Sequence, residues 1–364
     1  MIYTDFKGKK LSSLGFGAMR FPVLDGKDSQ IDETPSIALI EKSIELGINY
    51  FDTGWDYHKG KSEPFLAKAL AKYPRESYYI ADKFPGYNLL LFPEVDSIFE
   101  KQLVRLNVDY FDFYLLHNLC ELNVDAYLDP KFHVRESMSA RLESGQIKHL
   151  GVSSHAQPEC LLKFLESYGD IVEFCQIQLN VMDWDFQRAK ETVKILNDYN
   201  IPIWVMEPLR GGTIMDIASV EEAFDFVRSI DGVSVTLSGM STMDQLIENA
   251  EIFSRKPTLS EDDFNALVKR AADKVAKGAI PCTACKYCVH NCPMGLDIPY
   301  LLSLSNQFYL TKDDFIAPMA LGALKEDKQP WACIACGACE KVCPQKLKIS
   351  DLLSKFSADV KEKI

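Results

Sequence analysis

The sequence lacks any apolar run of the roughly 20 residues needed to cross a bilayer. Its first residues show neither the basic nor the apolar stretch of a secretion signal, so we expect a cytoplasmic protein without membrane association. Positive charge is also scarce, because 40 Lys and Arg stand against 52 Asp and Glu, for a net charge of −12. An acidic chain is a poor match for phosphates, and we expect no nucleic-acid partner.

The chain also lacks the glycine pattern of an open dinucleotide-binding sheet. Gly15 and Gly17 follow the first apolar segment, but no third glycine completes G-x-G-x-x-G, and Arg20 follows soon after. A Rossmann-type sheet is therefore not expected. No short flavin motif is present either, although a barrel can bind a flavin without one.

Cysteine, by contrast, is concentrated near the C-terminus. Eight of the 11 cysteines form two copies of C-x-x-C-x-x-C-x-x-x-C-P, a run that holds cubane clusters in bacterial two-cluster ferredoxins. In such runs the fourth cysteine ligates the other cluster. This rule assigns one [4Fe–4S] cluster to Cys282, Cys285, Cys288 and Cys343, and the second to Cys333, Cys336, Cys339 and Cys292.

Two other interpretations of these cysteines are weaker. A disulfide framework requires an oxidising compartment, and no export signal is visible. Zinc sites use cysteine pairs separated by a longer gap, not four cysteines in one run followed by proline. We therefore predict two [4Fe–4S] clusters, whereas Cys120, Cys160 and Cys175 lack the spacing and are expected to be small buried residues.

Upstream of the cysteines, short apolar segments alternate with amphipathic ones. The predicted strands are residues 14–19, 48–52, 79–83, 112–117, 149–153, 174–178, 202–206 and 233–238. Strand–helix alternation predicts a parallel sheet, and eight repeats over about 250 residues favour a closed (β/α)8 TIM barrel of the α/β class. Residues 2–4 and 10–12 predict a hairpin that closes the bottom of this barrel.

Three parts follow along the chain. We assign the barrel to residues 1–257, a linking helix to 258–280, and a small, mainly helical two-cluster ferredoxin-like domain to 281–364. Ser260 is a suitable N-cap, with acidic residues in the first turn after it. Further helices are predicted at 299–309, 314–324 and 349–360.

Polar residues stand at the predicted carboxyl ends of three neighbouring strands, where barrel enzymes place their active sites. Asp52, Lys83 and His117 end the second, third and fourth strands, and Tyr57 follows shortly after Asp52. Each alone has a structural interpretation, such as a buried ion pair between Asp52 and Lys83. Together they predict one site, in which Lys83 lowers the pKa of Tyr57 and Tyr57 protonates a carbonyl oxygen.

The segments that carry these residues resemble the aldo/keto reductase superfamily. Residues 47–53 followed by Tyr57, residues 109–117 and residues 145–154 are each similar to characteristic segments of that family. With its cysteine motifs, the chain is similar to the ferredoxin-like aldo/keto reductases of anaerobic microbes. The resemblance implies a tetrad in which Tyr57 is the general acid, Lys83 and Asp52 tune it, and His117 orients the substrate.

The resemblance also implies a nicotinamide cofactor. Its expected contacts to the carboxamide, the pyrophosphate and the adenine are Ser153, Ser154, Gln176, Leu209, Arg210, Gly211, Gly212, Glu248 and Asn249. Residues 238–245 carry no Lys or Arg for a 2′-phosphate, so a strong preference for NADPH (the NADP form) over NADH is not expected.

The predicted function is an iron–sulfur oxidoreductase of aldo/keto reductase type that acts on a small carbonyl or alcohol. Nicotinamide passes two electrons as hydride and each cluster passes one, so a flavin is a candidate third cofactor. The clusters would exchange electrons with a ferredoxin or another redox protein. Two alternatives are an ordinary carbonyl reductase with structural or sensory clusters, and an electron-transfer subunit whose barrel is a docking scaffold.

Overall fold

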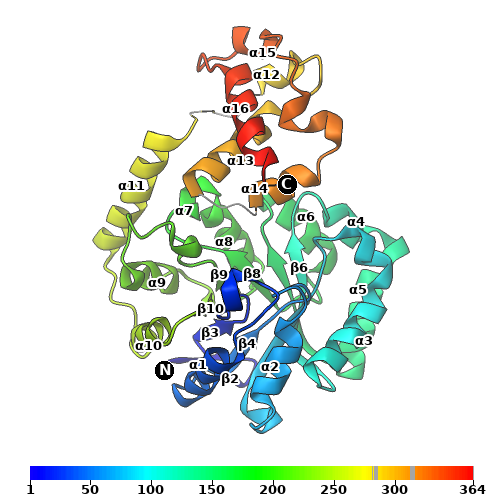
Figure 1. Cartoon of the computed structure of the whole chain (residues 1–364), viewed down its shortest axis with the longest axis vertical. Coiled ribbons are helices and arrows are strands. Elements are labelled where there is room, and N and C mark those ends of the chain that lie inside the picture. Colours follow the sequence, from blue (N-terminus) through cyan, green and yellow to red (C-terminus); the bar gives the residue numbers. More distant parts are fainter. Residues whose placement is uncertain (281, 283–285, 312–315, 364) are drawn as a thin grey trace. The chain divides into compact units, whose positions relative to one another are not determined.

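The computed structural model describes residues 1–280, 282, 286–311 and 316–363 (Figure 1). Contacts divide the chain into two compact units, Met1–Val268 and Lys269–Ile364, and the division falls within α11 (Glu261–Gly278). In the described part of the chain, no helix combines the length and the apolar character that crossing a bilayer requires. Each unit is described separately below.

Eight parallel strands of the first unit close into a barrel in the order β10-β3-β4-β5-β6-β7-β8-β9. The closed (β/α)8 barrel predicted from the sequence is confirmed, and most strand ends shift by only one or two residues. The strands are β3 (Leu14–Gly17), β4 (Tyr50–Asp52), β5 (Tyr79–Phe84), β6 (Phe111–Leu119), β7 (Ile147–Ser154), β8 (Phe174–Gln178), β9 (Ile203–Met206) and β10 (Val233–Ser238).

Helices surround the strands (Figure 1). They are α1 (Glu33–Glu45), α2 (Ser62–Leu70), α3 (Val95–Leu106), α4 (Val124–Leu128), α5 (Val134–Ser144), α6 (Pro158–Tyr168), α7 (Asp183–Phe186), α8 (Ala189–Asp198), α9 (Val220–Arg228) and α10 (Met243–Ile252). In α3, buried Val95, Ile98, Phe99, Leu103 and Leu106 recur every three or four residues, which forms one apolar face toward the barrel.

The sequence pattern predicts one helix at residues 185–198, but the structure divides this region. It contains the end of α7 and the whole of α8, because Arg188 adopts a left-handed conformation (φ 57°) that interrupts the helix. The sequence interpretation also missed α10, although its first turn carries a capping box between Thr242 and Gln245 that signals a helix start.

An antiparallel hairpin, β1 (Tyr3–Phe6) and β2 (Lys9–Ser12), closes the amino-terminal end of the barrel. Phe6 is buried, and its ring centroid lies 5.8 Å from that of Phe113 and 5.7 Å from that of Trp204. The predicted plug is therefore confirmed. Because the hairpin fills this end, the accessible end of the barrel is the one formed by the carboxyl ends of the strands.

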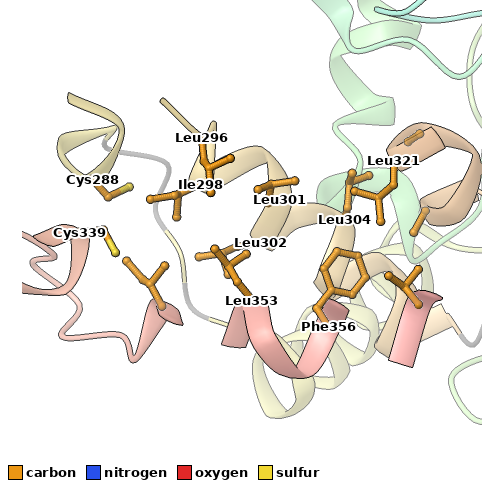
Figure 2. Packing of buried hydrophobic residues seen from close by; sticks show 14 residues of the cluster. Cys288, Leu296, Ile298, Leu301, Leu302, Leu304, Leu321, Cys339, Leu353 and Phe356 are labelled. Carbon is orange, nitrogen blue, oxygen red and sulfur yellow. The ribbon is translucent and has the colours of Figure 1, made fainter. Parts of the chain in front are cut away.

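The second unit is helical in its described residues. Beyond α11 its helices are α12 (Tyr287–His290), α13 (Ile298–Thr311), α14 (Ile316–Gly322), α15 (Ala338–Lys341) and α16 (Ile349–Lys361). The first residues of the helix predicted at 314–324 lie outside the described part. Figure 2 shows an apolar core in which Leu302, Leu353 and Phe356 pack together, with Cys288 and Cys339 at one end. The core therefore holds a cysteine of each motif.

Candidate active site and cluster cavities

Three of the predicted residues form one contact chain at the carboxyl ends of β4 and β5. Lys83 Nζ lies 2.5 Å from Asp52 Oδ1 and 3.3 Å from the Tyr57 hydroxyl oxygen. Asp52 pairs with Ala81 across the two strands, so it lies beside Lys83. Asp52 and Lys83 are buried, whereas Tyr57 is half-buried. The ammonium thus lies between a carboxylate and a phenol that remains partly accessible.

The pKa of Tyr57 does not follow the expectation from sequence. Burial raises it most, Lys83 lowers it and Asp52 raises it again, so that it lies above its ordinary value of 10.0. The expected net lowering is therefore wrong, because the effect of burial outweighs that of the ammonium. The phenol stays protonated at neutral pH.

Burial shifts the pKa values of Lys83 and Asp52 in opposite directions. Burial lowers the pKa of Lys83, but the Asp52 charge and Tyr57 outweigh it, and the net pKa is raised. Burial raises the pKa of Asp52, and although Lys83 and then Gln176 act to lower it, the net pKa is raised. The 2.5 Å contact to a charged Lys83 favours the carboxylate, and we describe the two as an ion pair.

His117, near the carboxyl end of β6, completes the predicted tetrad. Its ring centroid lies 5.9 Å from that of Tyr57 and 5.4 Å from that of Tyr87, both edge-on. Burial, followed by the charges of Lys83 and His155, holds the pKa of His117 well below 6.5. Its Nδ1 has no hydrogen-bond partner among the described residues. A neutral imidazole therefore flanks the tyrosine.

Side chains that lie between the barrel and its surrounding helices form hydrogen bonds with the backbone of Lys83. The Lys83 N–H donates to Asp82 Oδ1 at 2.8 Å, and Gln102 on α3 donates to the Lys83 carbonyl at 2.9 Å. Burial and the nearby Glu63 raise the pKa of Asp82 well above its ordinary value. Because successive strand residues point to opposite faces, fixing Asp82 outward directs Lys83 into the barrel.

Residues predicted to meet the nicotinamide lie on the neighbouring strands β7 and β8. Ser153 pairs with Gln176 in the sheet, and both are buried. The Ser153 hydroxyl lies 3.9 Å from the sulfur of Met206, and the Ser154 hydroxyl accepts a hydrogen bond from the Ala156 N–H. Gln176 Oε1 is buried with no partner among the residues described, so an acceptor is available there for an amide donor.

The other predicted cofactor residues follow β9 and β10. Gly211 and Gly212 are exposed beside Leu209, whereas the Arg210 side chain is buried and pairs with Asp183. On α10, Glu248 is exposed, and Asn249 is buried and donates to the Ser238 hydroxyl at 3.1 Å. A surface pocket bounded by α4, α5 and α6 contains none of the predicted site residues.

One cation near the end of β10 could not be predicted from the local sequence. Arg20, which follows β3, is exposed, and a Cβ at Gly239 would lie 2.6 Å from Arg20 Cγ. The Arg20 carbonyl accepts a hydrogen bond from the Ser241 hydroxyl at 2.7 Å. Because β3 and β10 are neighbours in the barrel, Arg20 brings positive charge to a loop that has none of its own.

The described cysteines of the two motifs line two small cavities. The first is lined by Cys333, Cys336 and Cys339 of the second motif together with Cys292 of the first. The second cavity is lined by Cys282 and Cys288 together with Cys343, while the predicted ligand Cys285 lies outside the described residues. Each cavity thus combines cysteines of both motifs.

The two motifs also share a local backbone geometry. Lys286 and Gly337 occupy equivalent positions and are both left-handed (φ 64° and 68°), and each precedes a four-residue helix. Those helices, α12 and α15, carry the buried Cys288 and Cys339. The repeated sequence therefore folds into a repeated structure around the cavities.

The chain combines a closed barrel that carries this polar set at its strand ends with a cysteine-rich C-terminal unit. The model of the aldo/keto reductase family matches residues 13–225, and that of the 4Fe-4S dicluster domain matches residues 281–347. The chain belongs to the aldo/keto reductase family and carries a 4Fe-4S dicluster domain at its C-terminal end. Both assignments agree with the resemblance recognised in the sequence.

Relatives resemble the chain in sequence, and solved structures share the barrel fold. The uncharacterized oxidoreductase YqkF of Bacillus subtilis is 21% identical, over 73% of this chain and 95% of its own length. The NADH-specific methylglyoxal reductase of Escherichia coli is 23% identical, over 56% of this chain and 65% of its own length. The holo form of the aldo-keto reductase AKR11C1 from Bacillus halodurans superposes with a TM-score of 0.58 at 22% identity, covering 72% of this chain and 93% of that one.

Proposed function

We propose that the barrel transfers hydride between NAD(P)H and a small carbonyl or alcohol substrate, with Tyr57 as general acid and base. The observation that carries this proposal is the contact chain from Asp52 through Lys83 to the Tyr57 hydroxyl. A protonated phenol beside a buried ammonium can donate its proton and is then stabilised as the phenolate. His117, neutral and edge-on to Tyr57, orients the substrate oxygen.

The donor set fits a nicotinamide. Gln176 Oε1 is a buried acceptor without a partner in the described part of the chain, and the carboxamide N–H would supply the missing donor. Ser153 and Ser154 add hydroxyl groups on the adjacent strand. When bound, the nicotinamide supplies the hydride, while the chain holds the substrate carbonyl and delivers the proton from the Tyr57 oxygen.

We further propose two [4Fe–4S] clusters in residues 281–364, with 258–280 as the linking segment. The two cavities support this assignment, because thiolates of both motifs meet in each one, as exchanged fourth ligands require. When bound, the clusters supply single-electron transfer. The proposed cellular location is the cytoplasm, and the proposed redox partner is a ferredoxin or a similar carrier.

The number of electrons that each unit transfers in one step restricts how the two units can exchange electrons. Reduction of a carbonyl to an alcohol consumes one hydride and one proton, which is a two-electron step, whereas each cluster handles one electron. Coupling the two therefore requires a group that exchanges both one and two electrons, such as a flavin.

The test of the barrel proposal is Tyr57→Phe, assayed with methylglyoxal as the probe substrate. We expect turnover to fall by about 10² to 10⁴-fold, because the proton donor is lost, while NAD(P)H affinity stays unchanged. Tyr199→Phe is the matched control, since Tyr199 is exposed at the end of α8. Full turnover in Tyr57→Phe would contradict the proposal and favour a docking role for the barrel.

A further inference from the structure

The loops of the two cysteine motifs match in their backbone as well as in their cysteines. The Val289 N–H donates to the Lys286 carbonyl at 3.1 Å, and in the second motif the Glu340 N–H donates to the Gly337 carbonyl at 3.2 Å. Lys286 and Gly337 have nearly the same φ, 64° and 68°. Glycine adopts this left-handed conformation readily, whereas lysine is strained in it. The first motif therefore retains a lysine at a conformational cost that the second motif avoids.

A second pair of matched positions follows the fourth cysteine of each motif. The Gly295 N–H donates to the Cys292 carbonyl, and the Lys346 N–H donates to the Cys343 carbonyl, both at 3.0 Å. Gly295 and Lys346 are also left-handed, with φ of 60° and 53°. In this pair the lysine follows the second motif and the glycine follows the first.

The cysteines assign these four positions to one cavity or the other. We name each cavity after its buried cysteine; the Cys288 cavity also holds Cys282 and Cys343, and the Cys339 cavity also holds Cys292, Cys333 and Cys336. Lys286 lines the Cys288 cavity, and Lys346 comes three residues after a cysteine of that cavity. Gly337 lines the Cys339 cavity, and Gly295 comes three residues after one of its cysteines. Both left-handed lysines therefore belong to the Cys288 cavity, and both glycines to the Cys339 cavity.

A third matched pair has the same bias in charge. Lys348 stands two residues beyond Lys346, whereas Asp297 stands two residues beyond Gly295. The Nζ of Lys348 lies 4.0 Å from the Glu340 carboxylate, which offsets part of its charge. Lys286 and Lys346 are therefore the main source of positive charge at the Cys288 cavity.

Other charged side chains near the Cys339 cavity largely cancel one another. Lys328 Nζ donates at 2.7 Å to the carbonyl of Met294, which lines this cavity, and Asp327 lies 3.9 Å from the same Nζ. Glu340 and Lys341 follow Cys339 directly and carry opposite charges. The two cavities thus differ in electrostatic environment although both are lined by cysteines.

We propose that Lys286 and Lys346 raise the reduction potential of the cluster in the Cys288 cavity above that of the cluster in the Cys339 cavity. The inference rests on the two clusters with exchanged fourth ligands proposed above. A [4Fe–4S] cluster gains one negative charge on reduction, so a nearby ammonium group stabilises the reduced form more than the oxidised form. A single electron added to the chain consequently resides mainly in the Cys288 cavity.

The test uses the full-length protein, loaded with clusters under anaerobic conditions. The double variant Lys286→Gly/Lys346→Gly gives both positions the residue of their counterparts and suits the left-handed backbone. Lys286→Asn/Lys346→Asn is a second neutral variant, because asparagine also tolerates this conformation. Gly337→Lys is the reverse change, and a Cβ added at Gly337 meets no atom within 4 Å. Lys325→Gln is the control, because Lys325 is exposed and lines neither cavity.

A reductive titration followed by electron paramagnetic resonance measures the potentials of both clusters, and iron content reports how fully each variant is loaded. We expect two separate reduction steps in the unchanged protein. In both neutral variants the upper step should move down while the lower step stays, so that the distribution of one electron between the clusters changes by about tenfold. Gly337→Lys should instead move the lower step up.

Three results would refute the inference: neutral variants that titrate as Lys325→Gln does, a shift of the lower step in place of the upper one, or an equal shift of both steps. An equal shift would show that the lysines act only through the net charge of the unit. Iron for fewer than two clusters in the unchanged protein would overturn the cluster proposal as well. Two loaded clusters whose potentials ignore the lysines would overturn this inference alone.

Discussion

Cys292 ends the first cysteine motif, yet it lines the same cavity as Cys339 of the second motif. Conversely, Cys343 ends the second motif and shares a cavity with Cys288 of the first. The motifs are far apart in sequence, so clusters ligated in this crossed way would connect both ends of the C-terminal unit. Loss of either cluster would then affect the packing of both motifs.

Paired cysteine substitutions test the crossed ligation. Cys292→Ser and Cys339→Ser, combined in one chain, should remove one cluster, because both cysteines belong to one cavity. Cys292→Ser combined with Cys288→Ser should remove both clusters. Iron content and the visible absorbance of anaerobically prepared protein report the outcome, with Cys120→Ala in the barrel as the control. Loss of both clusters in the Cys292/Cys339 variant, with loss of only one in the Cys292/Cys288 variant, would mean that each motif holds its own cluster.

The pH dependence of carbonyl reduction should be flat around neutrality. The pKa of His117 is held well below 6.5, so the imidazole becomes charged only in acid. The pKa of Tyr57 is raised above 10.0, so the proton donor is lost only in strong alkali. Measuring kcat for carbonyl reduction across pH tests both the lowered pKa of His117 and the raised pKa of Tyr57. An alkaline decline that begins below about pH 8 would indicate a Tyr57 pKa lowered by Lys83 instead.

Arg20 should favour NADPH over NADH. It is exposed beside Gly239, where the local sequence offers no cation for a 2′-phosphate. Arg20→Met should weaken NADPH binding by about tenfold, since a charge-assisted hydrogen bond is lost, and should leave NADH binding nearly unchanged. Fluorescence titration of both nucleotides measures this selectivity, with Lys27→Met as an exposed control on the same connection. If NADPH and NADH binding were weakened equally, a specific contact between Arg20 and the 2′-phosphate would be excluded.

Sequence alone predicted the barrel because local residue patterns indicate each of its strands and most of its helices. Six of the eight apolar segments end in polar residues, and the tetrad lies at three of those ends. The pattern of strand ends is therefore enough to predict that Asp52, Lys83 and His117 lie together. Each cysteine motif is likewise a contiguous run in the sequence and can be recognised without the fold. These features need no knowledge of how distant segments pack.

The features that were missed depend on contacts between distant residues or on burial. Arg20 stands beside Gly239 only because the barrel closes between β3 and β10. The pairing of Arg210 with Asp183 joins the connections after two strands. The net pKa shift of Tyr57 was predicted in the wrong direction because a sequence shows the neighbouring charge but not the extent of desolvation.

We propose that the clusters take part in the reaction of the barrel. The direct measurement mixes anaerobically prepared, oxidised protein with NADH or NADPH and methylglyoxal, and follows cluster absorbance and nucleotide oxidation together. We predict that the cluster absorbance changes on the timescale of turnover, and that a bound flavin is detected in the same sample. Constant cluster absorbance during continuing turnover would contradict the claim and would identify an ordinary carbonyl reductase whose clusters are structural or sensory.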